Sequence, residues 1–243
     1  QNIDQDFWPV YPGGFVELRF KPVDSLEVIP SVRFDYYSDI DELSIDPRLM
    51  GRLEISDETA VTAGFGVYQR PPDPWESDPD FGTTNILPER SVHASLGVEQ
   101  RLPYNIDVDV TGFYKWASNI VVSNPDSFTA ESVDPYVNDG TGRIYGAELL
   151  VRFAPISSVS GWVSYSYQKS FRQDTPEEEE RVFDLDQPNI LTMVGTWKID
   201  ASWSVGARMR YVTGNPWTPI ERTVYSSDHD IYVPIYGETN SER

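Results

Sequence analysis

Cysteine is absent from the 243 residues of this sequence. Its absence excludes a disulfide framework and thiol chemistry. Long apolar runs are also missing: no stretch reaches the roughly 18 residues that a transmembrane helix needs, so no such helix is expected. The first residues, Gln1 to Asp4, contain neither the basic nor the apolar region of a signal peptide, as a mature or a truncated chain would also show.

Basic residues are few in this sequence. The chain has 19 Lys and Arg against 39 Asp and Glu, which gives a formal net charge of −20. Because a nucleic-acid site needs a basic surface to neutralise phosphates, this balance argues against nucleic-acid binding.

The usual catalytic and metal-binding patterns are missing too. The only histidines are His93 and His229, and His93 shares a strand side with Ser91 and Ser95, so that a Ser–His pair is conceivable. No G-x-S-x-G nucleophile elbow, Gly-rich phosphate loop, Cys/His zinc spacing or H-E-x-x-H motif accompanies it. We therefore expect no enzyme, no catalytic residue, no cofactor and no metal site.

What the sequence does contain is a repeated alternation of apolar and polar residues. Two arms, joined by the short segment Asp200–Ser202, show it most clearly. Side chains of a β-strand alternate between its two faces, so each arm has an apolar face and a small, polar or basic one. The apolar set is Leu191, Met193, Gly195, Trp197 and Ile199 in the first arm and Trp203, Val205, Ala207, Met209 and Tyr211 in the second.

The same unit recurs along the chain and predicts an all-β protein of about ten antiparallel strands. Short turns alternate strictly with longer polar loops, the longest being 71–89, 119–141 and the loop around Glu177–Glu180. The expected strands are residues 15–20, 26–37, 44–55, 60–70, 90–101, 106–118, 143–153, 161–172, 190–199 and 203–211.

Two architectures fit such strands. A soluble β-sandwich usually has strands of about 5–7 residues and turns of mixed length. Strands of about 10–13 residues instead match the roughly 9–11 residues that cross a bilayer at a tilt, and outer-membrane barrels have short turns on one side and long loops on the other. The pattern favours a fragment of an antiparallel up-and-down transmembrane β-barrel, with lipid expected against Val28, Phe34, Leu49, Leu96, Leu149 and Met209.

The domain organisation expected from this pattern is simple. One partial outer-membrane barrel domain spans 1–243, with strands over about 15–213 and a long extracellular loop over 214–243.

Several segments resemble those of the TonB-dependent outer-membrane receptors. The hairpin Phe15–Tyr37 looks like one from their barrels, and Ile45–Leu49 resembles a strand start of the "(I/V)SPR" type. Further resemblances, in the family's order, are Leu87–Arg90 followed by Gly97–Glu99, Gly142–Glu148 and the loop entry Tyr211–Pro219.

This resemblance implies a barrel of about 22 strands, an N-terminal plug that fills it, and a periplasmic energy-coupling partner, TonB. No plug and no TonB-contact segment can be found before Phe15, and about ten strands are fewer than half of the implied number. We therefore expect a fragment that covers part of the C-terminal half of a receptor barrel in the outer membrane of a Gram-negative bacterium.

The resemblance also directs the choice of candidate site residues. Acidic and aromatic residues of the long loops are the candidates for ligand binding: Trp75, Asp78, Asp80, Trp217, Asp228 and Asp230. Charged residues on the polar strand faces are expected to line the lumen: Arg33, Arg48, Arg52, Asp107, Asp109, Lys115, Glu148, Arg208 and Arg210.

The function that follows is binding of a scarce ligand at the cell surface and its energy-coupled uptake into the periplasm. The expected partners are outer-membrane lipid and lipopolysaccharide, TonB through the missing N-terminal part, and a small-molecule or metal-chelate ligand. A passive porin-like or adhesive barrel is the alternative function, and a soluble β-sandwich binding module is the third.

Overall fold

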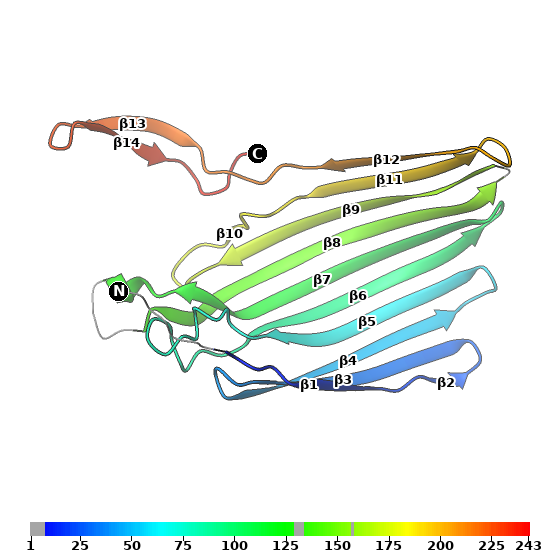
Figure 1. The fold of residues 1–243 in the computed structure, drawn as a ribbon, viewed down its shortest axis with the longest axis horizontal. Helices are drawn as coiled ribbons and strands as arrows, with labels where there is room; N and C mark the ends of the chain where they lie inside the picture. Colours follow the sequence, from blue (N-terminus) through cyan, green and yellow to red (C-terminus); the bar gives the residue numbers. More distant parts are fainter. Residues whose placement is uncertain (1–7, 129–133, 157) are drawn as a thin grey trace. The chain divides into compact units, whose positions relative to one another are not determined.

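The computed structural model describes residues 8–128, 134–156 and 158–243 (Figure 1). Its elements are almost entirely strands: β1 (Gly13–Glu17), β2 (Phe20–Val23), β3 (Leu26–Tyr37), β4 (Glu42–Glu54), β5 (Thr59–Arg70), β6 (Glu89–Leu102), β7 (Ile106–Ser123), β8 (Tyr136–Ile156), β9 (Val159–Gln173), β10 (Arg181–Val182), β11 (Asn189–Lys198), β12 (Ser204–Val212), β13 (Ile220–Ser226) and β14 (Ile231–Tyr236). A short 3₁₀ helix, η1, spans Pro125–Phe128. No helix among the described residues is long and apolar enough to cross a membrane.

The strands pair in chain order. Within the described residues the main sheet runs β1-β3-β4-β5-β6-β7-β8-β9-β11-β12, with β2 added to β3 and β10 added to β9. This antiparallel, up-and-down order of ten main strands confirms the predicted all-β fold. The strands β13 and β14 form a separate two-stranded sheet.

Three of the predicted strands differ from the structure by more than two residues at an end. The first is interrupted: β1 and β2 both pair with β3, and Leu18 donates its amide to Pro30 O at 3.0 Å. Pro30 has no N–H to return, which explains the break between β1 and β2. In addition, β7 and β8 extend to Ser123 and from Tyr136, so the loop between them is shorter than predicted.

The chain forms two compact units. The first comprises Gln1–Leu96, Tyr114–Gly142 and Gln173–Glu178, and the second comprises Gly97–Phe113, Arg143–Arg172 and Glu179–Arg243. Because neighbouring strands run in opposite directions, the longer connections of a unit lie at one end of its strands and the short turns at the other. These ends are called the long-loop end and the short-turn end.

In the first unit, the two faces of the sheet differ in character. The β3–β4 register pairs Phe34 with Ile45 and Pro30 with Leu49, so these apolar side chains share a face. That face is open: Phe34 is 40% exposed, Leu49 50% and Leu96 63%. The opposite face carries the polar pairs, such as Arg33 with Asp46.

The second unit repeats this division. Cross-strand pairs place Met193 opposite Met209 and Trp197 opposite Val205 on the apolar face, where Met209 is 57% exposed. Thr192 with Arg210 and Val194 with Arg208 lie on the other face. The register of the hairpin β11–β12 thus agrees with the alternation read from the sequence.

Candidate functional site

The long-loop end of the first unit contains most of its buried apolar side chains. Tyr37, Ile40, Ile86 and Val121 pack as one buried cluster, with Tyr136 against it. The cluster joins the end of β3, the β3–β4 turn, the β5–β6 loop (71–88) and the end of β7. Hydrophobic burial therefore stabilises the loops themselves.

Side-chain hydrogen bonds hold the β5–β6 loop to the start of β8. Thr83 Oγ1 donates to Tyr136 O at 2.8 Å and accepts from Tyr136 N at 3.1 Å. The side-chain oxygen of Asn138 accepts a hydrogen bond from Leu87 N at 2.7 Å, and its side-chain nitrogen donates to the carbonyls of Leu87 and Asn119 at 2.9 Å each. The loop is an ordered surface rather than a loose connection, because its backbone groups have side-chain partners.

Asp39, in the β3–β4 turn, connects two further segments at the same end. Its Oδ2 accepts hydrogen bonds from Tyr11 Oη at 3.0 Å and from Ser77 Oγ at 2.8 Å. Burial, together with the bond to Asp39 and its charge, raises the pKa of Tyr11 to about 12. Tyr11 therefore remains a neutral donor at physiological pH.

Glu76 is a partly buried acidic residue of the β5–β6 loop. Its carboxylate accepts from the Asp73 amide at 2.7 Å. Burial raises the pKa of Glu76, and the charges of Asp73 and Glu89 add to that rise. The long-loop end thus brings several acidic side chains together where they are partly shielded from water.

Two buried carboxylates lie where β3 and β4 meet this end. Asp46 is 2% exposed; it accepts from Ser44 Oγ at 3.1 Å and from the Gln69 amide at 3.1 Å. Asp35 forms a two-point ion pair with Arg33, at 2.6 and 2.7 Å. These carboxylates are engaged by protein donors, and no group of three or more His, Cys, Asp or Glu in the described residues is arranged to hold a metal ion.

A stack of three side chains crosses the polar face of the first unit. The Arg48 guanidinium lies 4.3 Å from the Tyr68 ring centroid, and Tyr68 stacks on His93 at 4.3 Å. His93 Nε2 lies 2.9 Å from Ser91 Oγ, so the structure brings together the Ser–His pair considered from the sequence. No carboxylate orients this histidine among the described residues, which leaves the pair without the third group of a catalytic triad.

Five of the predicted lumen-lining residues form ion pairs. Arg33 bonds Asp35, Arg52 lies 2.5 Å from Glu54, Asp107 lies 3.6 Å from Arg101, and Asp109 lies 2.6 Å from Arg152, while Arg48 lies 3.8 Å from Asp46. Lys115 is half-buried on β7 and Glu148 is exposed on β8. Arg208 and Arg210 are exposed on β12 and have no ion-pair partner among the described residues.

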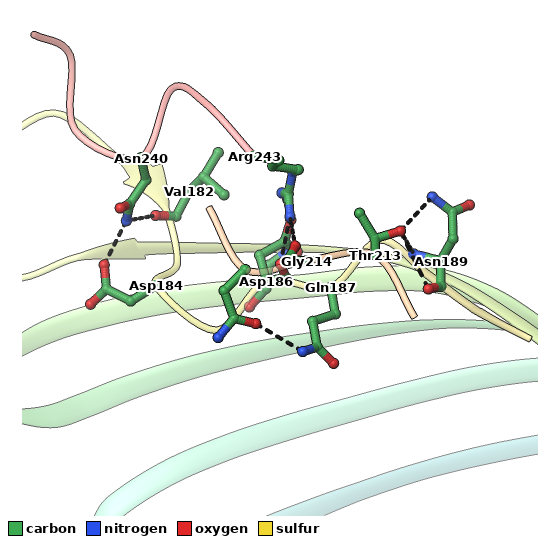
Figure 2. Close-up of polar contacts among 11 residues, drawn as sticks. Val182, Asp184, Asp186, Gln187, Asn189, Thr213, Gly214, Asn240 and Arg243 are labelled. Atoms are coloured by element: carbon green, nitrogen blue, oxygen red, sulfur yellow. Dashed lines mark hydrogen bonds and ion pairs between the residues drawn. The ribbon is translucent and has the colours of Figure 1, made fainter. Parts of the chain in front are cut away.

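At the long-loop end of the second unit, a polar cluster joins the loop before β11 to the segment after β12 (Figure 2). Asp186 is fully buried; its carboxylate accepts from the Ser170 amide at 2.7 Å and pairs with Arg243. Arg243 also donates to the carbonyl oxygens of Asp186 at 2.6 Å and Gly214 at 3.2 Å. One guanidinium thus fastens both ends of the segment 214–243.

Asn240 provides a second tie in this cluster. Its side-chain amide donates to Val182 O at 2.8 Å and to Asp184 Oδ1 at 2.5 Å (Figure 2). Nearby, Trp217 and Glu242 exchange backbone hydrogen bonds at 2.8 and 3.2 Å. The residues that flank the hairpin β13–β14 are therefore hydrogen-bonded to each other, and Asn240 attaches them to β10 and the β10–β11 loop.

The six predicted ligand-binding residues lie in the loops. Trp75 and Asp80 are exposed in the β5–β6 loop, where Asp78 Oδ1 accepts from the amides of Asp80 and Phe81 and so shapes a turn. In the second unit Trp217 lies at the hairpin base, and Asp228 and Asp230 lie in its tip, with Asp230 accepting from Tyr225 Oη at 2.7 Å. The structure describes these two groups in different units, and their role in binding stays a prediction.

Sequence reasoning missed the residues that fix the loops. Asp46 read as an ordinary residue on the polar side of the predicted strand 44–55, Asp186 as an ordinary loop residue, and Arg243 has no periodic context. The only available signal was local: Asp186-Gln187-Pro188-Asn189 has the residue types of a turn before a strand. Long-range partners such as Asp186 and Arg243 leave no pattern in a single sequence.

Comparisons with known proteins agree on one fold. A family model described as TonB dependent receptor-like, beta-barrel, matches residues 1–237. Comparison with curated protein sequences found no match. Among solved structures, the outer membrane transporter YddB from Escherichia coli aligns with a TM-score of 0.72 at 15% identity, over 94% of this chain and 37% of that one.

Two further structures are similar. The FrpB iron transporter from Neisseria meningitidis has a TM-score of 0.67 at 13% identity, over 94% of this chain and 36% of that one. The siderophore receptor PirA from Pseudomonas aeruginosa has a TM-score of 0.58 at 17% identity, over 83% and 42%. This chain thus spans well under half of the length of these structures.

Proposed function

This chain belongs to the TonB-dependent receptor-like β-barrel family, and from that premise we propose that it forms part of a receptor that binds a scarce ligand at the cell surface and takes it into the periplasm by energy-coupled transport. The family and its structural relatives are outer-membrane proteins of Gram-negative bacteria, so this chain is an outer-membrane protein as well. What we propose concerns the whole receptor: its activity, its ligand and its partners.

The observation that carries the proposal is the combination of an open apolar face with ordered long loops. Leu49, Leu96 and Met209 are half or more exposed, which suits contact with lipid rather than with water. At the long-loop end, buried side chains and side-chain hydrogen bonds hold the β5–β6 loop in place. A preorganised loop surface loses less entropy on binding a ligand than a flexible one does.

The proposed ligand is a small molecule or a metal chelate. Two of the structural relatives are described as an iron transporter and a siderophore receptor, which supports this class without identifying a compound. The loop residues proposed to contact it are Trp75, Asp78, Asp80, Trp217, Asp228 and Asp230. The other proposed partners are TonB, outer-membrane lipid and lipopolysaccharide, and no catalytic role is proposed.

Uptake by whole cells tests the proposal. Cells that carry the intact gene, a deletion of it, or the intact gene in a TonB-deficient background would be given a panel of ⁵⁵Fe-labelled ferric chelates. We expect one chelate to accumulate only when both the gene and TonB are present. Accumulation independent of TonB would favour a passive porin-like barrel, and binding of cells to surfaces without any uptake would favour an adhesive one.

Substitutions then connect uptake to the loops. Replacing Trp75 and Trp217 by Ala is expected to weaken surface binding of that chelate, whereas Trp197→Ala on the apolar face is the matched control and should leave binding unchanged. Equal binding by all of these variants would contradict the role proposed for the loop residues.

A further inference from the structure

Three cationic side chains share the polar face of β11 and β12. The register pairs Lys198 with Ser204, Thr196 with Gly206, Val194 with Arg208 and Thr192 with Arg210. On the neighbouring strand β9, Ser160, Trp162 and Ser164 lie opposite Thr196, Val194 and Thr192. Since residues two apart on a strand are separated by roughly 6.8 Å, these cations form a row that starts at the short-turn end.

A pocket of about 320 Å³ lies at the start of this row. Five of its lining side chains are hydroxyl groups, and Lys198 supplies an ammonium group among them. The lining residues are Pro155, Ser158, Ser160, Thr196, Lys198, Asp200, Ala201, Ser202, Trp203 and Ser204.

Among the described residues that line the pocket, the one carboxylate is that of Asp200, which is engaged by the turn between β11 and β12. Asp200 Oδ1 accepts hydrogen bonds from the amides of Ser202 at 2.7 Å and Trp203 at 2.9 Å. Lys198, Arg208 and Arg210 have no ion-pair partner within the described parts of the chain. On other strands, Arg33, Arg52 and Arg152 are each paired with a carboxylate.

We propose that this pocket binds the carboxylate or phosphate group of a small anionic molecule. The Lys198 ammonium and the surrounding hydroxyl groups are hydrogen-bond donors, which is what an oxyanion with several acceptor oxygens requires. Arg208, two rungs along the row, does not line the pocket but adds a second positive charge on the same face. The site lies at the opposite end of the strands from the loops, so it does not depend on which ligand the loops bind.

Titration calorimetry on the intact protein in detergent and phosphate-free buffer tests this site. Citrate and inorganic phosphate are the two probes, which distinguish a carboxylate site from a phosphate site. We expect saturable binding of at least one of them, weakened tenfold or more in the double variant K198Q/R208Q, because charged hydrogen bonds are lost. The variant K198R keeps the charge and is expected to keep binding.

The matched control is Arg222→Gln, which removes an exposed arginine of β13 outside the pocket. It should bind both probes as the unmodified protein does. Circular dichroism and resistance to unfolding in detergent establish that each variant is folded. Absence of saturable binding of both probes, or unchanged binding by the folded double variant, would overturn the proposal.

Discussion

At the long-loop end of each unit, a few buried side chains make hydrogen bonds to distant parts of the sequence. Asp46 and Asp186 are almost completely buried, and each accepts hydrogen bonds from groups distant in the sequence. A buried carboxylate that loses a hydrogen-bond donor is still shielded from water, so the free-energy cost of its desolvation is no longer offset. Substitutions that remove these donors are therefore expected to destabilise the protein.

Arg243→Gln tests this at the polar cluster of the second unit. Loss of the guanidinium leaves the Asp186 carboxylate with fewer donors, at a cost of about 1–3 kcal/mol. We expect the segment 214–243 to open more often and trypsin to cut after Arg222 roughly tenfold faster. The control is Arg19→Gln, which removes an exposed ion pair with Glu27 at 3.6 Å. Equal cleavage rates in the two variants would contradict the role of the Arg243–Asp186 pair in holding the segment.

Tyr11 offers a test by titration. Its pKa of about 12 lies above the ordinary 10.0, so the folded protein retains a proton that the unfolded chain has lost. The stabilisation by the Tyr11–Asp39 bond is therefore complete below pH 10 and is lost as pH rises toward 12. The absorbance at 295 nm of the unmodified protein minus that of Tyr11→Phe should show a midpoint near pH 12.

Asp39→Asn is the matched variant for this titration. It removes the charge that helps to keep the tyrosine neutral, so the midpoint for Tyr11 should fall. A Tyr11 midpoint near 10 in the unmodified protein would contradict both its burial and its contact with Asp39.

At the scale of strands and turns, much of the structure could be predicted from the sequence. Alternation alone assigned Met209 and Arg210 to opposite faces. The side chains of a strand alternate with a period of two, and a face that is buried or lipid-facing fixes the register. The interruption at Leu18 was not predicted, since it depends on Pro30 lying across from it in β3. The β13–β14 hairpin was not predicted either, because its residues lack a clear alternation between two faces and are mostly exposed.

The directly paired glycines of β9 and β11 provide a test of strand packing. A Cβ at Gly161 would lie 2.2 Å from Val194 O and 2.8 Å from Phe153 Cζ, whereas a Cβ at Gly195 would meet nothing within 4 Å. Gly161→Ala is expected to destabilise the protein by about 1–3 kcal/mol, measured as a lower urea midpoint in detergent. Gly195→Ala, its partner, should unfold at an unchanged or slightly higher midpoint, and the reverse ranking would contradict the structure.

For the molecule as a whole, the medium around the apolar face decides its stability. The small buried cluster of the first unit lies at its long-loop end, while large apolar side chains such as Phe65, at 54% exposed, stand open along the strands. In water this surface would favour aggregation. In the outer membrane, we propose that lipid covers this surface.

Adjacent residues of β4 test this directly. Leu49 and Met50 are 50% and 59% exposed on opposite faces. In lipid vesicles Leu49→Arg should cost about 2–4 kcal/mol of unfolding free energy, because the charge enters hydrocarbon. Met50→Arg should change it by less than about 0.5 kcal/mol, as at other solvated positions. Equal costs in a urea titration would refute the assignment of lipid to the Leu49 face.

The self-closed base of β13–β14 has an evolutionary consequence. Backbone hydrogen bonds between Trp217 and Glu242, with the anchor of Arg243, hold the hairpin independently of its tip residues, Ser227 to Asp230. Mutations at the tip therefore leave the contacts of the hairpin base in place. Selection can diversify what this arm displays without re-optimising the strands that carry it.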